Sequence, residues 1–147
     1  MRTILYAMMM SLALPGCGSR SAPGETGSAP PPGTASAGGC YRHVAGRDTT
    51  FLRLNVDGAA VTGELAVLPF EKDKARGAIR GTRSGSQVRA DWQRSGEGVT
   101  EPYEVVFTLR GDTVTWWEGE RVRREGKWVL KEPGAGYQYV MVRAACP

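Results

Sequence analysis

Few side chains in this sequence are suited to acid–base or nucleophilic chemistry. His43 is the single histidine, so a Ser-His-Asp or Cys-His mechanism would have to use it, and its place near the start of a predicted strand favours a partly exposed strand histidine. Glu118 and Glu120 fall on one face of a predicted strand, with Cβ atoms about 6.5–7 Å apart, a separation known from glycosidase carboxylate pairs. Arginines follow at once, so charges on a solvated sheet face explain the glutamate pair more simply.

The same inventory argues against a cofactor or a metal. Three cysteines and one histidine make a four-ligand zinc site only if every sulfur is used. The sequence also has no Gly-rich loop leading into a helix, so nucleotide binding has no support. We therefore predict a protein that is not an enzyme, with no catalytic residues, no cofactor and no metal.

The first residues have the pattern of an export signal. A positive start at Arg2 precedes a mostly apolar run from Thr3 to Leu14, which is shorter than the ~20 residues needed to span a bilayer. The run ends in Leu14-Pro15-Gly16-Cys17, which resembles the lipobox of bacterial lipoproteins. The resemblance implies that a peptidase recognises Leu14 and Gly16, removes residues 1–16 and leaves Cys17 as a lipidated first residue.

A lipidated Cys17 would hold the protein on a membrane, because two or three acyl chains are enough for stable anchoring. Residue 18 is Gly and not the Asp that marks inner-membrane retention in some lipoproteins, so the expected location is the cell envelope, at the outer membrane. All but four of residues 18–39 are Gly, Ser, Pro or Ala, a composition that cannot form a core. Residues 17–39 are thus predicted to be a lipidated, flexible tether.

Residues 40–147 have the pattern of an all-β domain. Apolar residues alternate with polar ones, as in Leu52, Leu54 and Val56, and no window has a sustained helical period. Turn residues recur about every dozen positions. They lie at Gly46–Asp48, Asp57-Gly58, Pro69–Lys74, Ser84-Gly85, Ser95–Gly98, Gly111-Asp112, Glu125-Gly126 and Pro133–Gly136. We predict an antiparallel up-and-down meander that closes into a small barrel of eight or nine strands, with a two-sheet sandwich as the alternative.

Cys40 and Cys146 lie at opposite ends of this domain. With Cys17 lipidated they form an even pair in an exported protein, where disulfides persist. Closure of a barrel brings its first and last strands side by side, so we predict a Cys40–Cys146 disulfide. An open sheet would instead leave the two residues on opposite edges, too far apart to bond.

Part of the domain, from Gly39 to about Phe107, is similar to a family of small, uncharacterised, β-rich bacterial envelope lipoproteins. The matching features include Gly39-Cys40-Tyr41, Val61-Thr62-Gly63-Glu64-Leu65 and Glu71-Lys72-Asp73-Lys74. The resemblance implies an exported β domain. It brings no established activity with it.

Aromatic residues supply the main indication of a binding surface. Trp116 and Trp117 are adjacent on a predicted strand, so they must point to opposite faces and one of them must leave the core. We predict a binding patch made of Trp117, Arg121 and Arg123, a filled barrel interior, and a monomer that binds a protein or glycan partner and no nucleic acid. The alternatives are a lipocalin-like carrier of one small apolar ligand and an inhibitor of an envelope-directed enzyme.

Overall fold

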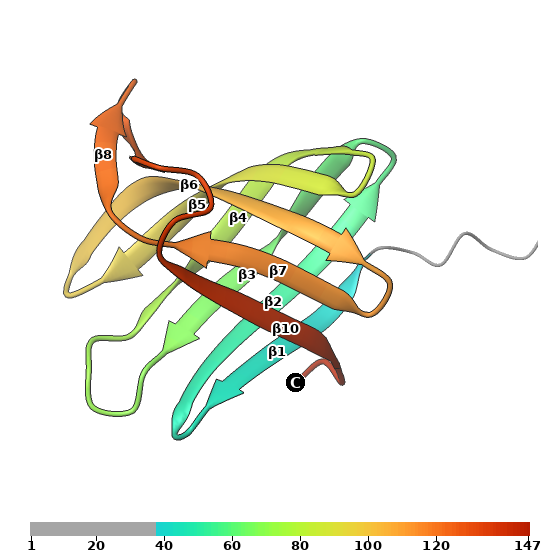
Figure 1. Ribbon diagram of the computed structural model, residues 1–147, viewed down its shortest axis with the longest axis horizontal. Helices are drawn as coiled ribbons and strands as arrows, with labels where there is room; N and C mark the ends of the chain where they lie inside the picture. Colours follow the sequence, from blue (N-terminus) through green and yellow to red (C-terminus); the bar gives the residue numbers. More distant parts are fainter. Residues whose placement is uncertain (1–37) are drawn as a thin grey trace, which may run out of the picture. The chain divides into compact units, whose positions relative to one another are not determined.

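The computed structural model describes residues 38–147, which contain ten strands and no helix (Figure 1). The all-β prediction is therefore confirmed. The strands are β1 (Gly39–Ala45), β2 (Asp48–Asp57), β3 (Ala60–Leu68), β4 (Ala75–Ser84), β5 (Gln87–Gly96), β6 (Val99–Arg110), β7 (Thr113–Glu118), β8 (Arg121–Arg124), β9 (Lys127–Leu130) and β10 (Tyr137–Ala144). The proposed signal, Leu14, Gly16, Cys17 and nearly all of the tether lie outside the described residues.

Each of the eight predicted turn segments separates two strands. At the Asp57-Gly58 turn the central residues are Gly58 and Ala59. The backbone of Gly58 has a φ of +57°, a value that residues other than glycine rarely adopt. A ninth break, at Gly119 and Glu120, divides β7 from β8. This break was not predicted from the sequence, because Glu118 and Glu120 were expected on one strand.

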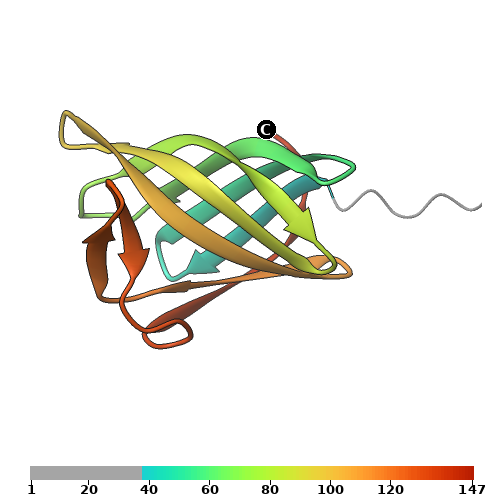
Figure 2. The ribbon, with the colours of Figure 1, turned by 90° about the horizontal axis from the view of Figure 1, so that it is seen from above.

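Eight strands close into a barrel, as predicted. Strands β1 to β7 pair antiparallel in sequence order, β7 pairs with β10, and β10 returns to β1, while the β5–β6 pairing completes the circuit (Figures 1 and 2). Strands β8 and β9 form an extra hairpin between β7 and β10. Closure pairs both edges of the barrel strands, which removes the open sheet edges that invite aggregation.

Alternation along the strands fills the barrel interior with apolar side chains. Leu52, Leu54, Ile79 and Phe107 are at most 1% exposed, and the large rings Trp92 and Trp116 are 2% exposed. Burying each such side chain contributes about 1.5–3 kcal/mol. The two tryptophans meet edge to face, with ring centroids 6.2 Å apart. The interior is thus packed, and the split between buried Trp116 and outward Trp117 is as predicted.

The two ends of the barrel differ. One end, here called the base, carries the turns at residues 58–59, 85–86 and 111–112, the start of β1 and the end of β10. The Cys40–Cys146 disulfide lies there, with Cα atoms 5.3 Å apart, which confirms the predicted bridge. The opposite end, here called the mouth, carries the turns at 46–47 and 97–98, the loop 69–74 and the β8–β9 hairpin (Figure 2).

Candidate binding surfaces of the barrel

The β8–β9 hairpin fills a gap in the barrel wall. Strand β7 pairs with β6 only as far as Trp116, opposite Phe107, and nearer the mouth β6 has no β7 partner. There β9 lies beside β6 instead, in a short parallel pairing of Trp128 with Tyr103. We call this junction of β6, β7 and β9 the seam. It explains why the chain leaves the meander after β7: the hairpin covers backbone of β6 that would otherwise be unpaired.

Arg121 is the residue that joins the seam. Its Nε and Nη2 donate to the two carboxylate oxygens of Glu118 at 2.7 and 2.8 Å, while Nη1 donates to the backbone oxygens of Glu104 and Trp128. The guanidinium also lies 5.0 Å from the ring centroid of Tyr103. Only 7% of the Arg121 side chain is exposed. Arg121 therefore holds three strands together and is not available to a partner.

The two glutamates do not share a strand face, so that expectation is wrong. β7 ends at Glu118, and Glu120 lies in the break before β8. Each carboxylate has its own cation, Arg121 for Glu118 and Lys131 for Glu120, the latter at 2.9 Å. Gly119 in the sequence was the available signal for the break, because glycine inside a strand pattern often marks an interruption.

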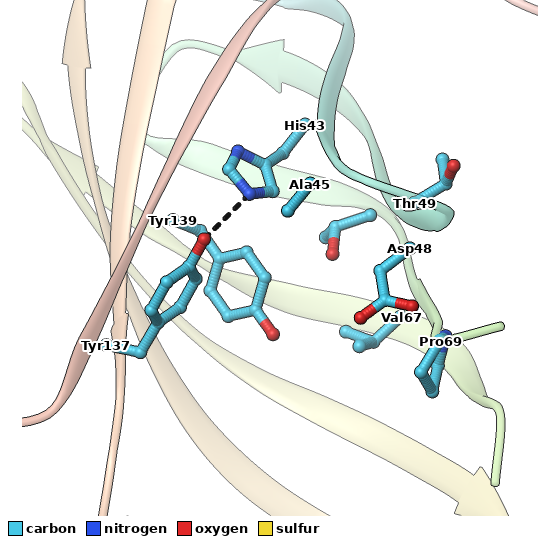
Figure 3. A pocket seen from close by; sticks show the side chains of 9 residues that line it. His43, Ala45, Asp48, Thr49, Val67, Pro69, Tyr137 and Tyr139 are labelled. Atoms are coloured by element: carbon cyan, nitrogen blue, oxygen red, sulfur yellow. Dashed lines mark hydrogen bonds between the residues drawn. The ribbon is translucent and has the colours of Figure 1, made fainter. Parts of the chain in front are cut away.

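The mouth contains a pocket of about 280 Å³ in which His43 lies (Figure 3). His43 Nδ1 donates to the Val140 carbonyl at 2.9 Å, because a carbonyl can only accept, and Nε2 accepts from the Tyr137 hydroxyl at 3.0 Å. Figure 3 shows Tyr139 and the Asp48 carboxylate on opposite sides of the pocket. The pocket is lined by His43, Ala45, Asp48, Thr49, Thr50, Val67, Pro69, Tyr137 and Tyr139.

Tyr139 closes the inner side of this pocket. Its ring stacks on Trp116 with centroids 4.7 Å apart, so the packed core begins directly beneath it. Burial raises the pKa of the Tyr139 phenol, and the negative charges of Glu118 and Asp48 raise that pKa further. The phenol thus stays protonated, and the hydrogen bond between Tyr137 and His43 holds those two side chains against each other at the pocket.

A second concave surface lies on the outside of the barrel, around Trp117. This Trp117 groove has a volume of about 310 Å³. Its floor comes from the outward residues of β5, β6 and β7, and its wall comes from the end of β9 and the segment that follows it. The lining residues are Gln87, Arg89, Glu104, Val106, Thr108, Thr115, Trp117, Leu130, Pro133 and Gly134. Arg89 and Glu104 form an ion pair of 2.6 Å on this floor.

Of the five basic residues at positions 121–131, all but the exposed Arg124 are paired with acidic ones. Besides Arg121 and Lys131, Arg123 pairs with Glu101 at 3.1 Å, and Lys127 pairs with Asp91 at 2.7 Å. The hydrogen bond to Asp91 raises the pKa of Lys127 above its ordinary value, with smaller contributions from the charges of Asp91 and Glu104. The cations of the hairpin thus stabilise the seam and its surroundings and do not form a free basic patch.

The predicted patch of Trp117, Arg121 and Arg123 is therefore divided. Trp117 lines the outer groove, Arg121 is inside the seam, and Arg123 lies over the Trp128 ring at 5.8 Å, beside Glu101. Neither arginine lines the groove. No sequence pattern identifies Arg89, Glu104, Val106 and Leu130 as groove residues. They come together with Trp117 only through closure of the barrel and the return of the hairpin.

Comparison of the chain with protein-family models, with curated proteins and with solved structures finds no match. The resemblance to small envelope lipoproteins accordingly stays a prediction. Residues 38–147 contain no helix with the length and apolarity needed to cross a bilayer. The same residues contain no group of three or more His, Cys, Asp or Glu side chains placed to hold a metal ion.

Proposed function

We propose that this protein is a lipid-anchored lipoprotein of the cell envelope, at the outer membrane, whose non-enzymatic barrel binds a protein or glycan partner on its outer surface. The observation that carries the proposal is the packed interior. A barrel of eight strands either holds one small ligand or fills itself with side chains. This one is filled by Trp92, Trp116, Phe107 and Tyr41, all at most 2% exposed.

The Trp117 groove is the surface best suited to such a partner. It combines a tryptophan, apolar walls and a few polar side chains, the composition typical of binding sites. It also lies on the wall of the barrel and not at the base, where β1 starts. Its lining includes no residue of β1, so the start of that strand at Gly39 does not cover it.

A carrier of one small apolar ligand is the second candidate, and the mouth pocket is the observation in its favour. The pocket has the polar groups of His43, Asp48 and Thr50 among its lining, and Tyr139 and Trp116 separate it from the core. A carrier would therefore hold its ligand at the rim and not along the barrel axis. Such a ligand would contact Tyr137, which makes a Tyr137→Phe variant a means of separating the two sites.

The binding proposal predicts that Trp117 is needed to retain a partner. The measurement is capture from envelope extracts with the full-length protein as bait, followed by mass spectrometry and glycan analysis. Trp117→Ala should lose the partner, because it removes the largest apolar side chain of the groove. Val142→Ala is the matched control, since Val142 is 57% exposed and lies outside the groove. Equal recovery by Trp117→Ala and the unaltered protein would contradict the assignment of the groove.

The anchoring proposal predicts that Cys17→Ser abolishes lipidation and releases the protein from the membrane. The thiol of Cys17 would be the acceptor of the acyl glycerol, and a serine hydroxyl does not replace it. Metabolic labelling with a fatty-acid analogue and fractionation of the envelope measure the two effects. A mutant that is labelled as strongly as the original protein would rule out Cys17 as the site.

A further inference from the structure

Trp117 differs from the other three tryptophans because its ring contributes neither to the packed core nor to the contacts of the seam. Trp92 and Trp116 pack against each other in the core, and Trp128 lies 6.2 Å from the Tyr103 ring and donates from Nε1 to Glu101 at 2.8 Å. Among residues 38–147, Trp117 has no ring partner and no side-chain hydrogen bond. It is half-buried in the groove. A large ring held in place without an internal partner is a surface on which a ligand can stack.

Polar side chains with several hydrogen-bonding atoms line the same groove as this ring. Arg89 Nη1 donates to Glu104 Oε1, which leaves other N–H groups of Arg89 available, and the Arg89 side chain is 60% exposed. Gln87 and Thr108 lie opposite each other on β5 and β6 and line the same groove. The planar guanidinium of Arg89 and the planar amide of Gln87 can each bond to two neighbouring hydroxyl groups at once, as a guanidinium bonds to the two oxygens of a carboxylate.

The groove has little net charge to offer a charged ligand. Arg89 and Glu104 neutralise each other, and Lys127 at 3.7 Å from Glu104 is itself paired with Asp91. The remaining lining residues are uncharged. An anionic or a cationic ligand would lose its hydration on entering without gaining an unpaired countercharge. The charges of the groove therefore favour a neutral ligand that carries many hydroxyl groups.

We propose that the Trp117 groove binds a neutral oligosaccharide, with the C–H face of one sugar ring stacked on the Trp117 indole and its hydroxyl groups bonded to Arg89, Glu104 and Gln87. The inference rests on the proposed function and names the partner class for the same site. A sugar ring combines an apolar face with a polar edge, which is the combination that the groove presents. The groove volume of about 310 Å³ lies at the lower end of the ~300–1,000 Å³ range of small-ligand sites, so it fits a short oligosaccharide segment.

This surface is less suited to binding a peptide. Peptides that bind to sheets in extended form gain affinity by pairing their backbone with an open strand edge. Most of the strand backbone under the groove is already paired, because β6 pairs with β5 along its length, with β7 from Phe107 to Arg110 and with β9 at Tyr103. Strand β7 pairs with β10 through Trp117 and Gln138. Recognition therefore relies mainly on side chains, as it does for sugars.

The test is a titration of the full-length protein, in a detergent without a sugar headgroup, with defined oligosaccharides. The neutral probes are trimers of N-acetylglucosamine, glucose (β1,4- and α1,4-linked) and mannose, and the acidic probe is a galacturonic acid trimer. Calorimetry gives the affinity, and tryptophan fluorescence reports on the ring. We expect saturable binding of at least one neutral trimer. Trp117→Ala should weaken it by about tenfold or more, and Trp117→Phe less than Trp117→Ala, because Phe keeps an aromatic face.

Two further variants locate the contact. Arg89→Ala should weaken binding several-fold, whereas Tyr137→Phe, which alters the mouth pocket, should leave the affinity unchanged. The sugar proposal is overturned if no neutral trimer binds, if the acidic trimer binds more tightly than all of them, or if Trp117→Ala binds as well as the original protein. Should no trimer bind while Trp117 remains necessary for capture of a protein from the envelope, the proposed function stands and the glycan assignment alone fails.

Discussion

Arg121 shows how the surroundings of a residue decide its role. In the sequence it follows Trp117 in a basic run, which indicated an exposed contact residue. In the fold its guanidinium donates to Glu118, Glu104 and Trp128 at the seam. The planar fork of arginine suits this position, because several N–H groups must bond in fixed directions while the side chain is almost fully buried.

We predict that Arg121→Met lowers the free energy of unfolding by about 2 kcal/mol, because backbone oxygens of Glu104 and Trp128 lose a donor and Glu118 loses its countercharge. Arg123→Met is the matched control on the same strand. Arg123 is 55% exposed, so loss of its ion pair should cost at most about 1 kcal/mol. Urea denaturation of both variants measures the difference. Equal destabilisation would mean that Arg121 does not hold the seam.

The path of strand β4 requires a glycine at residue 77, because no side chain fits there. Gly77 faces the interior between Ala75 and Ile79, and the Gln93 carbonyl of β5 occupies the space that a Cβ would need. The pairing of β4 with β5 is interrupted at the same place, between the pairs Arg76–Ser95 and Ile79–Trp92, and resumes in the same register. Glycine at such a position lets a strand bend sharply, as the closure of a small barrel requires.

The corresponding prediction is that Gly77→Ala destabilises the barrel by about 1–3 kcal/mol, the usual cost of forcing extra atoms into a packed site. Gly96→Ala on the neighbouring strand is the control, since its added Cβ would come no closer than 3.0 Å to the Lys74 carbonyl. Thermal unfolding followed by circular dichroism compares the two. A Gly77→Ala protein as stable as the original would show that β5 can shift without cost.

The molecule as a whole is closed twice, by strand pairing and by a covalent bond. β1 and β10 pair along Cys40–Ala144, Tyr41–Arg143 and Arg42–Val142, and the disulfide joins Cys40 to Cys146 across the same junction. The bridge links residues 106 positions apart, so it restricts nearly the whole unfolded domain. It also holds the start of β1 against the end of β10 at the base.

Reduction of the disulfide should lower stability without unfolding the barrel. Chain-entropy theory gives an upper value of about 4.7 kcal/mol for a loop of this size, and the packed interior supplies the remaining stability. Denaturation with and without a reductant measures the change, and a Cys40→Ser/Cys146→Ser protein should match the reduced form. The prediction fails if the far-ultraviolet β signal disappears on reduction, because strand pairing and core packing would then not be enough.

The sequence alone was sufficient for the barrel, the disulfide and the strands, except for the division of β7 from β8. Turn residues such as Asp57-Gly58 and the alternation of Leu52, Leu54 and Val56 are local signals, readable from neighbours in the chain. The pairing of Cys40 with Cys146 followed from closure, since a meander has one way to bring its ends together. Trp117 was also identified as outward-facing, because adjacent strand residues point to opposite faces.

The candidate site was decided only by the tertiary structure. Arg89, Glu104, Trp117 and Leu130 come from four strands and meet because the sheet curves and the β8–β9 hairpin folds back beside β6. The exchange of β7 for β9 at the seam depends on long-range contacts that leave no periodic pattern in the sequence. The pairing of charges also depends on long-range contacts. Arg121 and Lys127 belong to a basic segment of the chain, but the carboxylates that neutralise them are brought into contact with them by the folded barrel.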